Sequence, residues 1–111
     1  MTDPSRSAAR SSARSSARSS GGAIARRVVA HGRVQGVFFR ASTQEVASDH
    51  GVVGWVSNRS DGAVEAWLEG PQDGVRSVED WIRAGGPRSA SVTEVDVEDV
   101  TPAGHTRFAV S

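Results

Sequence analysis

The chain has 111 residues, enough for one small domain, and its 13 basic residues, all arginine, balance 13 acids. It has no cysteine, which excludes disulfides, thiolate nucleophiles and Cys-ligated zinc. No apolar run is long enough to span a membrane, and the three histidines lack metal-ligand spacing. We therefore expect no membrane contact, no metal and no cofactor.

The charge is divided unevenly between two parts of the chain. Residues 1–25 have a net charge of +3, whereas residues 26–111 hold nine arginines and twelve acids, a net charge of −3. An acidic domain lacks the basic face that nucleic-acid binding requires. We expect no nucleic-acid partner.

Residues 1–25 are expected to form a disordered tail, and residues 26–111 the folded domain. A Ser-Ala-Arg-Ser repeat runs through residues 5–20, and no Val, Leu, Ile, Phe or Trp lies between Met1 and Ile24. Such a segment cannot bury enough surface to offset its ordering entropy. A transit peptide is the alternative, but it needs an apolar face that this tail lacks. A start site assigned too far upstream would also explain the tail.

The first half of the domain reads as strand, helix, strand. A β-branched run places a strand at residues 26–33, and apolar spacing of three and four predicts a helix over 39–50. Gly51 is suited to end that helix in the left-handed conformation. Residues 52–57 follow as a second strand.

The second half also reads as strand, helix, strand, followed by a short final strand. Asp61-Gly62 marks a hairpin turn at residues 58–62, before a strand at 63–69 whose side chains alternate. On this strand Val64, Ala66 and Leu68 are expected to face inward, and Glu65, Trp67 and Glu69 outward. A helix at 73–84, a strand at 92–98 and a short strand at 106–110 complete the chain.

The order β-α-β-β-α-β predicts the ferredoxin-like α+β sandwich, an antiparallel sheet with two helices on one face. The expected core consists of Val29, Phe39, Val46, Val64, Leu68, Val78, Ile82, Val95 and Phe108.

A strand, a glycine-containing loop and a helix start follow one another between Val28 and Arg40. The first turn of a helix has unpaired N–H groups, and its dipole favours an anion there. Arg40 lies just inside the helix, where its guanidinium can add charge-assisted bonds to a phosphate or carboxylate. Alternatively, Gly32 and Gly36 only make a turn and Arg40 is a solvated residue, and this motif alone does not decide between the two.

A second motif supplies the specificity. Gly32-Arg33-Val34-Gln35-Gly36-Val37-Phe38-Phe39-Arg40, Gly51-Val52-Val53-Gly54-Trp55-Val56-Ser57-Asn58 and Asp61-Gly62-x-Val64-Glu65 together resemble the acylphosphatase family over residues 26–111. The resemblance implies a hydrolase that cleaves acyl phosphates to a carboxylate and inorganic phosphate. It implies that Arg40 binds the phosphoryl group and Asn58 positions the attacking water.

The residue chemistry agrees with that implication. Phosphoryl transfer depends on positioning and charge stabilisation, which an arginine and backbone amides can supply without a metal. The amides expected to form the cradle are those of Gln35, Gly36, Val37, Phe38 and Phe39. We also expect inorganic phosphate to inhibit as the product, and the protein to act as a cytoplasmic monomer.

Two other classes of function can use a domain of this fold. An RNA-recognition domain of the same fold needs exposed aromatic residues and a basic sheet face, whereas the first strand shows Val28, Ala30 and Arg33. A non-hydrolytic sensor of acyl phosphate or carbamoyl phosphate would use the same cradle to bind without turnover. An acyl-phosphate turnover assay separates the sensor from the enzyme.

Overall fold

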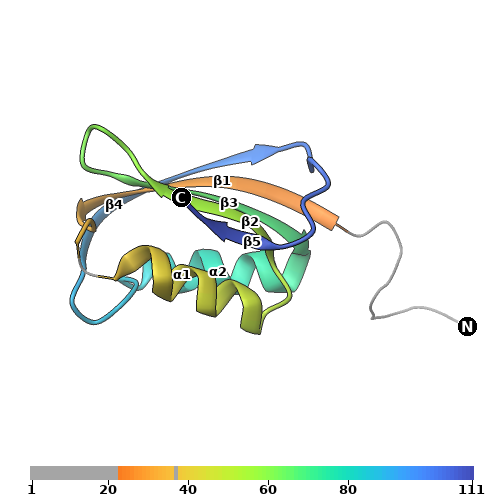
Figure 1. Cartoon of the computed structure of the whole chain (residues 1–111), viewed down its shortest axis with the longest axis horizontal. Helices are drawn as coiled ribbons and strands as arrows, with labels where there is room; N and C mark the ends of the chain where they lie inside the picture. The colour runs from red at the N-terminus through yellow and green to blue at the C-terminus, as the bar shows by residue number, and fades with distance from the viewer. Residues whose placement is uncertain (1–22, 37) are drawn as a thin grey trace, which may run out of the picture.

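The computed structural model describes residues 23–36 and 38–111 (Figure 1). The expectation of a disordered tail lies outside the described residues for residues 1–22, whereas residues 23–25 belong to the first strand. The elements are β1 Ala23–Arg33, α1 Phe39–Asp49, β2 Val53–Asn58, β3 Val64–Pro71, α2 Gln72–Arg83, β4 Ser91–Val100 and β5 Phe108–Val110. In the described part of the chain, no helix is long and apolar enough to cross a membrane.

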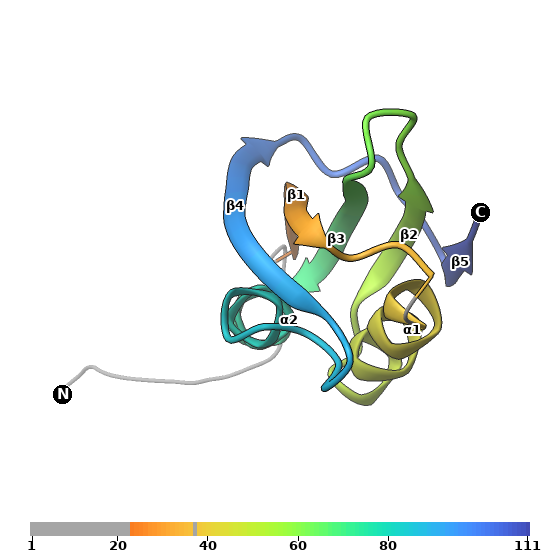
Figure 2. The ribbon, with the colours of Figure 1, turned by 90° about the vertical axis from the view of Figure 1, so that its left-hand side faces the viewer.

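The five strands form one sheet in the order β4-β1-β3-β2-β5. The first four pair antiparallel, which confirms the ferredoxin-like βαββαβ arrangement, while β5 pairs parallel to β2 and makes the whole sheet mixed. Both helices lie on one face of the sheet, as Figures 1 and 2 show. β1 begins at Ala23, three residues before the predicted strand, and Ala23 already pairs with Pro71.

The core lies between the sheet and the helices. Six of the predicted core residues are buried in it, and two more pack against its edge: Phe39, Val64, Leu68, Val78, Ile82 and Phe108, then Val46 and Val95. Val29 is the exception. It is buried, but it pairs with Glu65 and Asp96 on the opposite face of the sheet, because its neighbours Val28 and Ala30 take the core positions.

The outward-facing side of β3 is not open to solvent along its whole length. Glu69 faces away from the helices, as the alternation predicts, yet only 5% of it is exposed. The connection between β4 and β5 folds over it, and His105 packs edge-on against Trp67, with ring centroids 6.0 Å apart. This coverage comes from residues more than thirty positions away, which strand periodicity cannot reveal.

Four donors hold the buried Glu69 carboxylate. Oε1 accepts from the Trp67 indole N–H and the Ala103 amide, both at 2.9 Å. Oε2 accepts from the amides of Gly104 at 2.9 Å and His105 at 3.2 Å. Burial raises the pKa of Glu69, but these hydrogen bonds outweigh it and hold the pKa below its usual range. The carboxylate thereby fixes the path that leads the chain into β5.

Candidate active site

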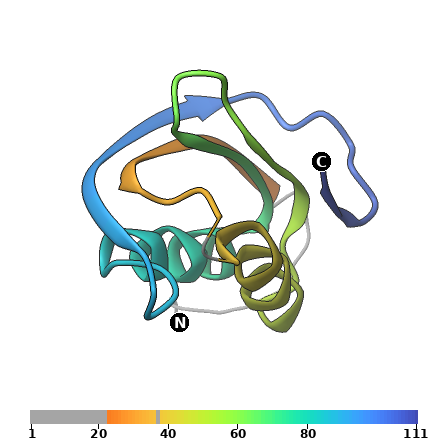
Figure 3. The ribbon, with the colours of Figure 1, turned by 60° about the vertical axis from the view of Figure 1, so that its left-hand side comes forward.

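Those predicted site residues that the structure describes lie at one end of the sheet. β1 and β2 both end there, so the β1–α1 connection and the β2–β3 hairpin lie at the same end of the molecule (Figures 1 and 3). They border a cleft of about 290 Å³, lined by Val34, Gly36, Phe38, Phe39, Arg40, Ala41, Asn58 and Val110. The structure thus brings Arg40 and Asn58 to a shared cleft although 18 positions separate them in the sequence.

The start of α1 is shaped to receive an anion. Gly36 and Phe38 have positive φ, 74° and 60°, and the chain turns there into the first helical residue, Phe39. No side chain caps this end of the helix and no acid lies in its first turn. Its amides and dipole are therefore free to act on an anion in the cleft. Val37, whose amide is predicted to belong to the cradle, lies outside the described residues.

Gln35 has a role that the sequence did not indicate. It was predicted to act through its backbone amide, but its side-chain Nε2 donates to the carbonyl oxygens of Arg59, at 2.8 Å, and Ala63, at 2.9 Å. The anion-binding loop is thereby tied to the hairpin that carries Asn58. Both acceptors are backbone atoms, so no residue type in the sequence could have revealed them.

The β2–β3 hairpin is also braced internally. The Ala63 amide donates to Asp61 Oδ1 at 3.1 Å, and Arg59 Nη2 lies 3.1 Å from Asp61 Oδ2. The Ala63 amide and the Arg59 guanidinium hold the pKa of Asp61 below its usual range. Gly62, with φ 94°, closes the turn. These contacts fix the end of β2, where Asn58 lies.

Asn58 is exposed at the cleft, and its side chain forms no hydrogen bond with another residue of the described ranges. An amide group offers both a donor and an acceptor. In this position it can hold a water molecule over the start of α1.

Two parts of the chain position Arg40, the first turn of α1 and the C-terminal end. It is the second residue of α1, and its Nη1 donates to the backbone oxygen of Ser111, just beyond β5. Gln44, one turn further along α1, donates to the Phe108 carbonyl at 3.0 Å. The site therefore includes the end of β5 and the residue after it, and neither Val110 nor Ser111 is among the predicted site residues. Their proximity depends on the parallel β2–β5 pairing, for which the sequence gives no local signal.

The donor chemistry of this region is that of an anion site. In residues 23–36 and 38–111, no group of three or more His, Asp or Glu side chains is placed to hold a metal ion. The cleft lining itself holds one cation, Arg40, and no carboxylate.

Comparison with known proteins gives a consistent result. The Acylphosphatase family profile matches residues 26–110. An acylphosphatase of Gloeobacter violaceus is 47% identical over 88 residues, which cover 79% of this chain and 94% of that protein.

Two solved structures share the fold. The acylphosphatase of Bacillus subtilis is 36% identical, with a TM-score of 0.76 over 79% of this chain and 98% of that one. The acylphosphatase of Coxiella burnetii is 33% identical, with a TM-score of 0.77 over 81% and 94%. The sequence motifs, the fold and these relatives agree, and this chain belongs to the acylphosphatase family.

Proposed function

We propose that this chain hydrolyses acyl phosphates, the mixed anhydrides of a carboxylic acid and phosphate, by attack of water on a phosphoryl group. The observation that carries the proposal is the meeting of Arg40 and Asn58 in one cleft at the uncapped start of α1. The phosphoryl oxygens bind Arg40 and the backbone amides of Gln35, Gly36, Val37, Phe38 and Phe39.

Arg40 supplies the charge stabilisation. Its planar guanidinium can donate two parallel hydrogen bonds to phosphoryl oxygens, and these strengthen as negative charge develops in the transition state. The contact with Ser111 and the helical backbone hold the group near the cleft before substrate binds. Little reorganisation is then needed during the reaction.

Asn58 positions the nucleophile. The water oxygen attacks phosphorus, the bond between phosphorus and the acyl oxygen breaks, and the carboxylate leaves with that electron pair. Asn58 has no basic group, so the proton of the water passes to an oxygen of the substrate's own phosphate. A carboxylate is a good leaving group and needs no proton from the enzyme.

The reaction is proposed to need no metal, because the arginine and amides provide the charge stabilisation that magnesium gives in other phosphoryl transfers. The cleft, lined by one guanidinium and no carboxylate, supports this. We further propose that the protein acts as a monomer in the cytoplasm, without a nucleic-acid partner, and that inorganic phosphate occupies the cradle as product and inhibitor.

A turnover assay on acetyl phosphate, with and without EDTA, tests the proposal. We expect release of phosphate that is unchanged by chelation and inhibited competitively by inorganic phosphate. Activity that disappears with EDTA and returns with magnesium would refute the metal-free reaction. Phosphate binding without any turnover would instead identify the chain as a sensor.

A further inference from the structure

Two large apolar side chains are markedly exposed in the described part of the chain, and both line the candidate cleft. Phe38 is 82% exposed and Val110 is 42% exposed. They come from distant segments, the start of α1 and the last strand, so their meeting does not follow from sequence proximity. Their coincidence beside Arg40 indicates that this wall of the cleft receives something apolar.

The backbone at Phe38 strengthens this reading. Its φ and ψ are 60° and 22°, in the left-handed region that bulky residues rarely adopt. Among the residues that the structure describes, every other residue with positive φ is a glycine. Glycine or asparagine would fit that conformation with less strain. The phenylalanine ring gains no burial in the fold that would offset the strain. A strained residue retained at a site is a sign of use there.

Val110 is held firmly on the other side. It pairs with Val56 in the parallel β2–β5 ladder, and the next residue, Ser111, donates its amide to the Val56 carbonyl at 2.9 Å. The Arg40 guanidinium binds the backbone oxygen of the same Ser111. The valine side chain is therefore fixed close to the group that is proposed to bind phosphate.

The remaining lining divides the cleft by chemistry. Arg40 and Asn58 are its polar side chains, and its apolar side chains include the buried Val34 and Phe39 and the exposed Phe38 and Val110. An acyl phosphate has the same division, since a dianionic phosphoryl end is joined to an acyl chain. The phosphoryl group makes no use of apolar side chains, whereas an apolar acyl chain can pack against them.

We propose that Phe38 and Val110 form an acyl-binding lip, which makes the enzyme favour acyl phosphates with extended apolar acyl groups. The inference rests on the proposed function and adds the substrate class. Straight-chain acyl phosphates longer than acetyl phosphate place methylene groups against the two side chains. A chain that ends in a charged group gains nothing from them.

The test compares hexanoyl phosphate with acetyl phosphate. Acetic and hexanoic acids have nearly the same acidity, so the two substrates differ in apolar length and not in leaving-group ability. The readout is the ratio of kcat/KM for hexanoyl phosphate to that for acetyl phosphate, measured in each variant. Any damage to the phosphate cradle affects both substrates and cancels in the ratio. We expect a ratio of about ten or more for the unaltered chain, from added methylenes on an apolar surface.

Two substitutions at position 38 separate the side chain from the backbone. Phe38→Asn tolerates the left-handed conformation but removes the apolar surface, so the ratio should fall roughly tenfold, toward one. Phe38→Leu keeps an apolar side chain and should retain most of the preference. Val110→Ser should lower the ratio about threefold, because a smaller surface is lost.

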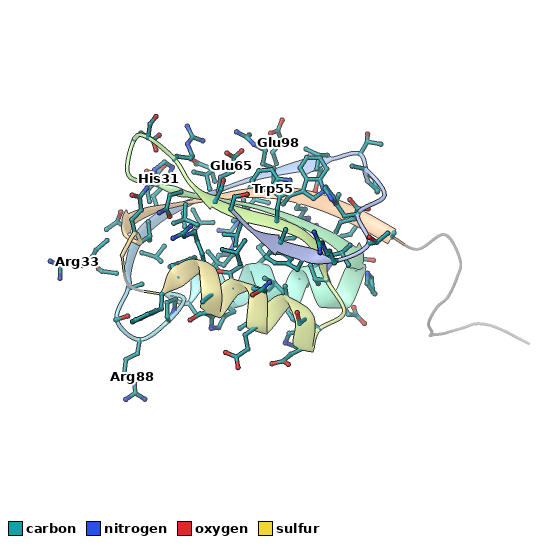
Figure 4. All side chains as sticks on the ribbon, in the orientation of Figure 1. His31, Arg33, Trp55, Glu65, Arg88 and Glu98 are labelled. Carbon is teal, nitrogen blue, oxygen red and sulfur yellow. The ribbon has the colours of Figure 1, made fainter. Side chains whose placement is uncertain are left out.

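Arg88→Ala is the matched control. Arg88 lies at the same end of the molecule but extends away from it (Figure 4) and does not line the cleft. Its substitution should leave the ratio unchanged.

The proposal is overturned if Phe38→Asn and Val110→Ser both keep the ratio within about twofold of the unaltered chain. It is equally overturned if the unaltered chain hydrolyses both substrates with the same kcat/KM. These outcomes differ from failure of the proposed function, in which neither acyl phosphate is hydrolysed at all.

Discussion

At the scale of single residues, the proposed chemistry depends on a guanidinium that is already in place. Arg40→Lys keeps a positive charge but loses the planar fork that can bind two phosphoryl oxygens and the Ser111 oxygen together. We expect kcat/KM for acetyl phosphate to fall about a hundredfold or more in both Arg40→Lys and Arg40→Ala. Steady-state kinetics with thermal melts check this, since both variants should remain folded. A lysine variant with near-normal kcat/KM would show that charge alone suffices.

Asn58 is expected to behave differently, because it is proposed to contact the attacking water and not the phosphate. Asn58→Ala should lower kcat about a hundredfold, the effect of removing one preorganised polar group. Its inhibition constant for inorganic phosphate should barely change, since the ground-state contacts remain. If phosphate binding weakened as much as in Arg40→Ala while kcat survived, Asn58 would be a phosphate ligand instead.

The buried carboxylate of Glu69 is expected to stabilise the fold. Both of its oxygens accept two hydrogen bonds, so an amide at this position must aim its NH₂ group at donors in either orientation. Glu69→Gln should therefore lower the free energy of unfolding by about 2–3 kcal/mol. Urea unfolding at pH 7 measures the loss. The exposed Glu45→Gln, in α1, serves as the control and should change stability by less than about 0.5 kcal/mol.

The pH dependence of this difference has a definite sign. The pKa of Glu69 in the folded protein lies below its ordinary value of 4.5, so the charged form favours folding. Its stabilisation is fully present above the unfolded pKa and is lost as the pH falls through the folded pKa. The difference in the free energy of unfolding between the unaltered chain and Glu69→Gln should therefore become smaller as the pH falls below about 4.5. A gap that stayed constant down to pH 3 would contradict the charged carboxylate.

At the scale of elements, the close approach of α2 to the α1–β2 connection depends on Gly74. This glycine is buried in the first turn of α2, and a Cβ there would overlap the carbonyl oxygen of His50 and lie 3.2 Å from Val52 Cγ2. Helix propensity alone favours Gly74→Ala by about 1 kcal/mol. The overlap with the His50 carbonyl should make the substitution destabilising instead, because that carbonyl can move only if α2 and the α1–β2 connection separate.

We expect Gly74→Ala to lower the free energy of unfolding by about 1–3 kcal/mol, as overpacked sites do. Chemical denaturation measures the change. Arg76→Ala, exposed in the same helix, should stay within about 0.5 kcal/mol of the unaltered chain. A stabilised Gly74→Ala would show that propensity outweighs the packing constraint.

The same elements show what the sequence could predict. Periodicity and turn residues predicted the order and type of every helix and strand, because these signals are local. The glycine-loop motif and Asn58 predicted that Arg40 and Asn58 share a cleft with Gly36, Phe38 and Phe39, whereas Gln35 does not line it. Sequence reasoning missed the Gln35 bridge, the burial of Glu69 and the place of Val110, since each depends on backbone atoms or strand pairings distant in the chain. Val29 is buried, as predicted, but on the face of the sheet away from the helices, because two adjacent valines do not show which one points toward the helices.

At the scale of the whole molecule, the cleft is assembled from the β1–α1 loop, the β2–β3 hairpin, the first turn of α1 and the end of β5. Specific contacts connect these segments in pairs: Gln35 of the β1–α1 loop bonds to the hairpin, and Arg40 and Gln44 of α1 bond to Ser111 and Phe108 at the C-terminal end. All of them belong to residues 23–111. We therefore expect the fold and the candidate site to form without residues 1–22.

Deletion of residues 1–22 tests this division of the chain. The segment has no Val, Leu, Ile, Phe or Trp, so it can add little apolar surface to the core, whereas Ala23 is already paired with Pro71 in the sheet. We expect the truncated chain to keep its melting temperature within about 2 °C, a shift that corresponds to well under 1 kcal/mol for a domain of this size. Its kcat/KM for acetyl phosphate should stay within about twofold, since the +3 charge of residues 1–25 alters only long-range attraction of an anionic substrate. Raising the salt concentration should remove even that difference. A larger loss of stability, or a loss of activity that persists at high salt, would show that the N-terminal segment belongs to the domain.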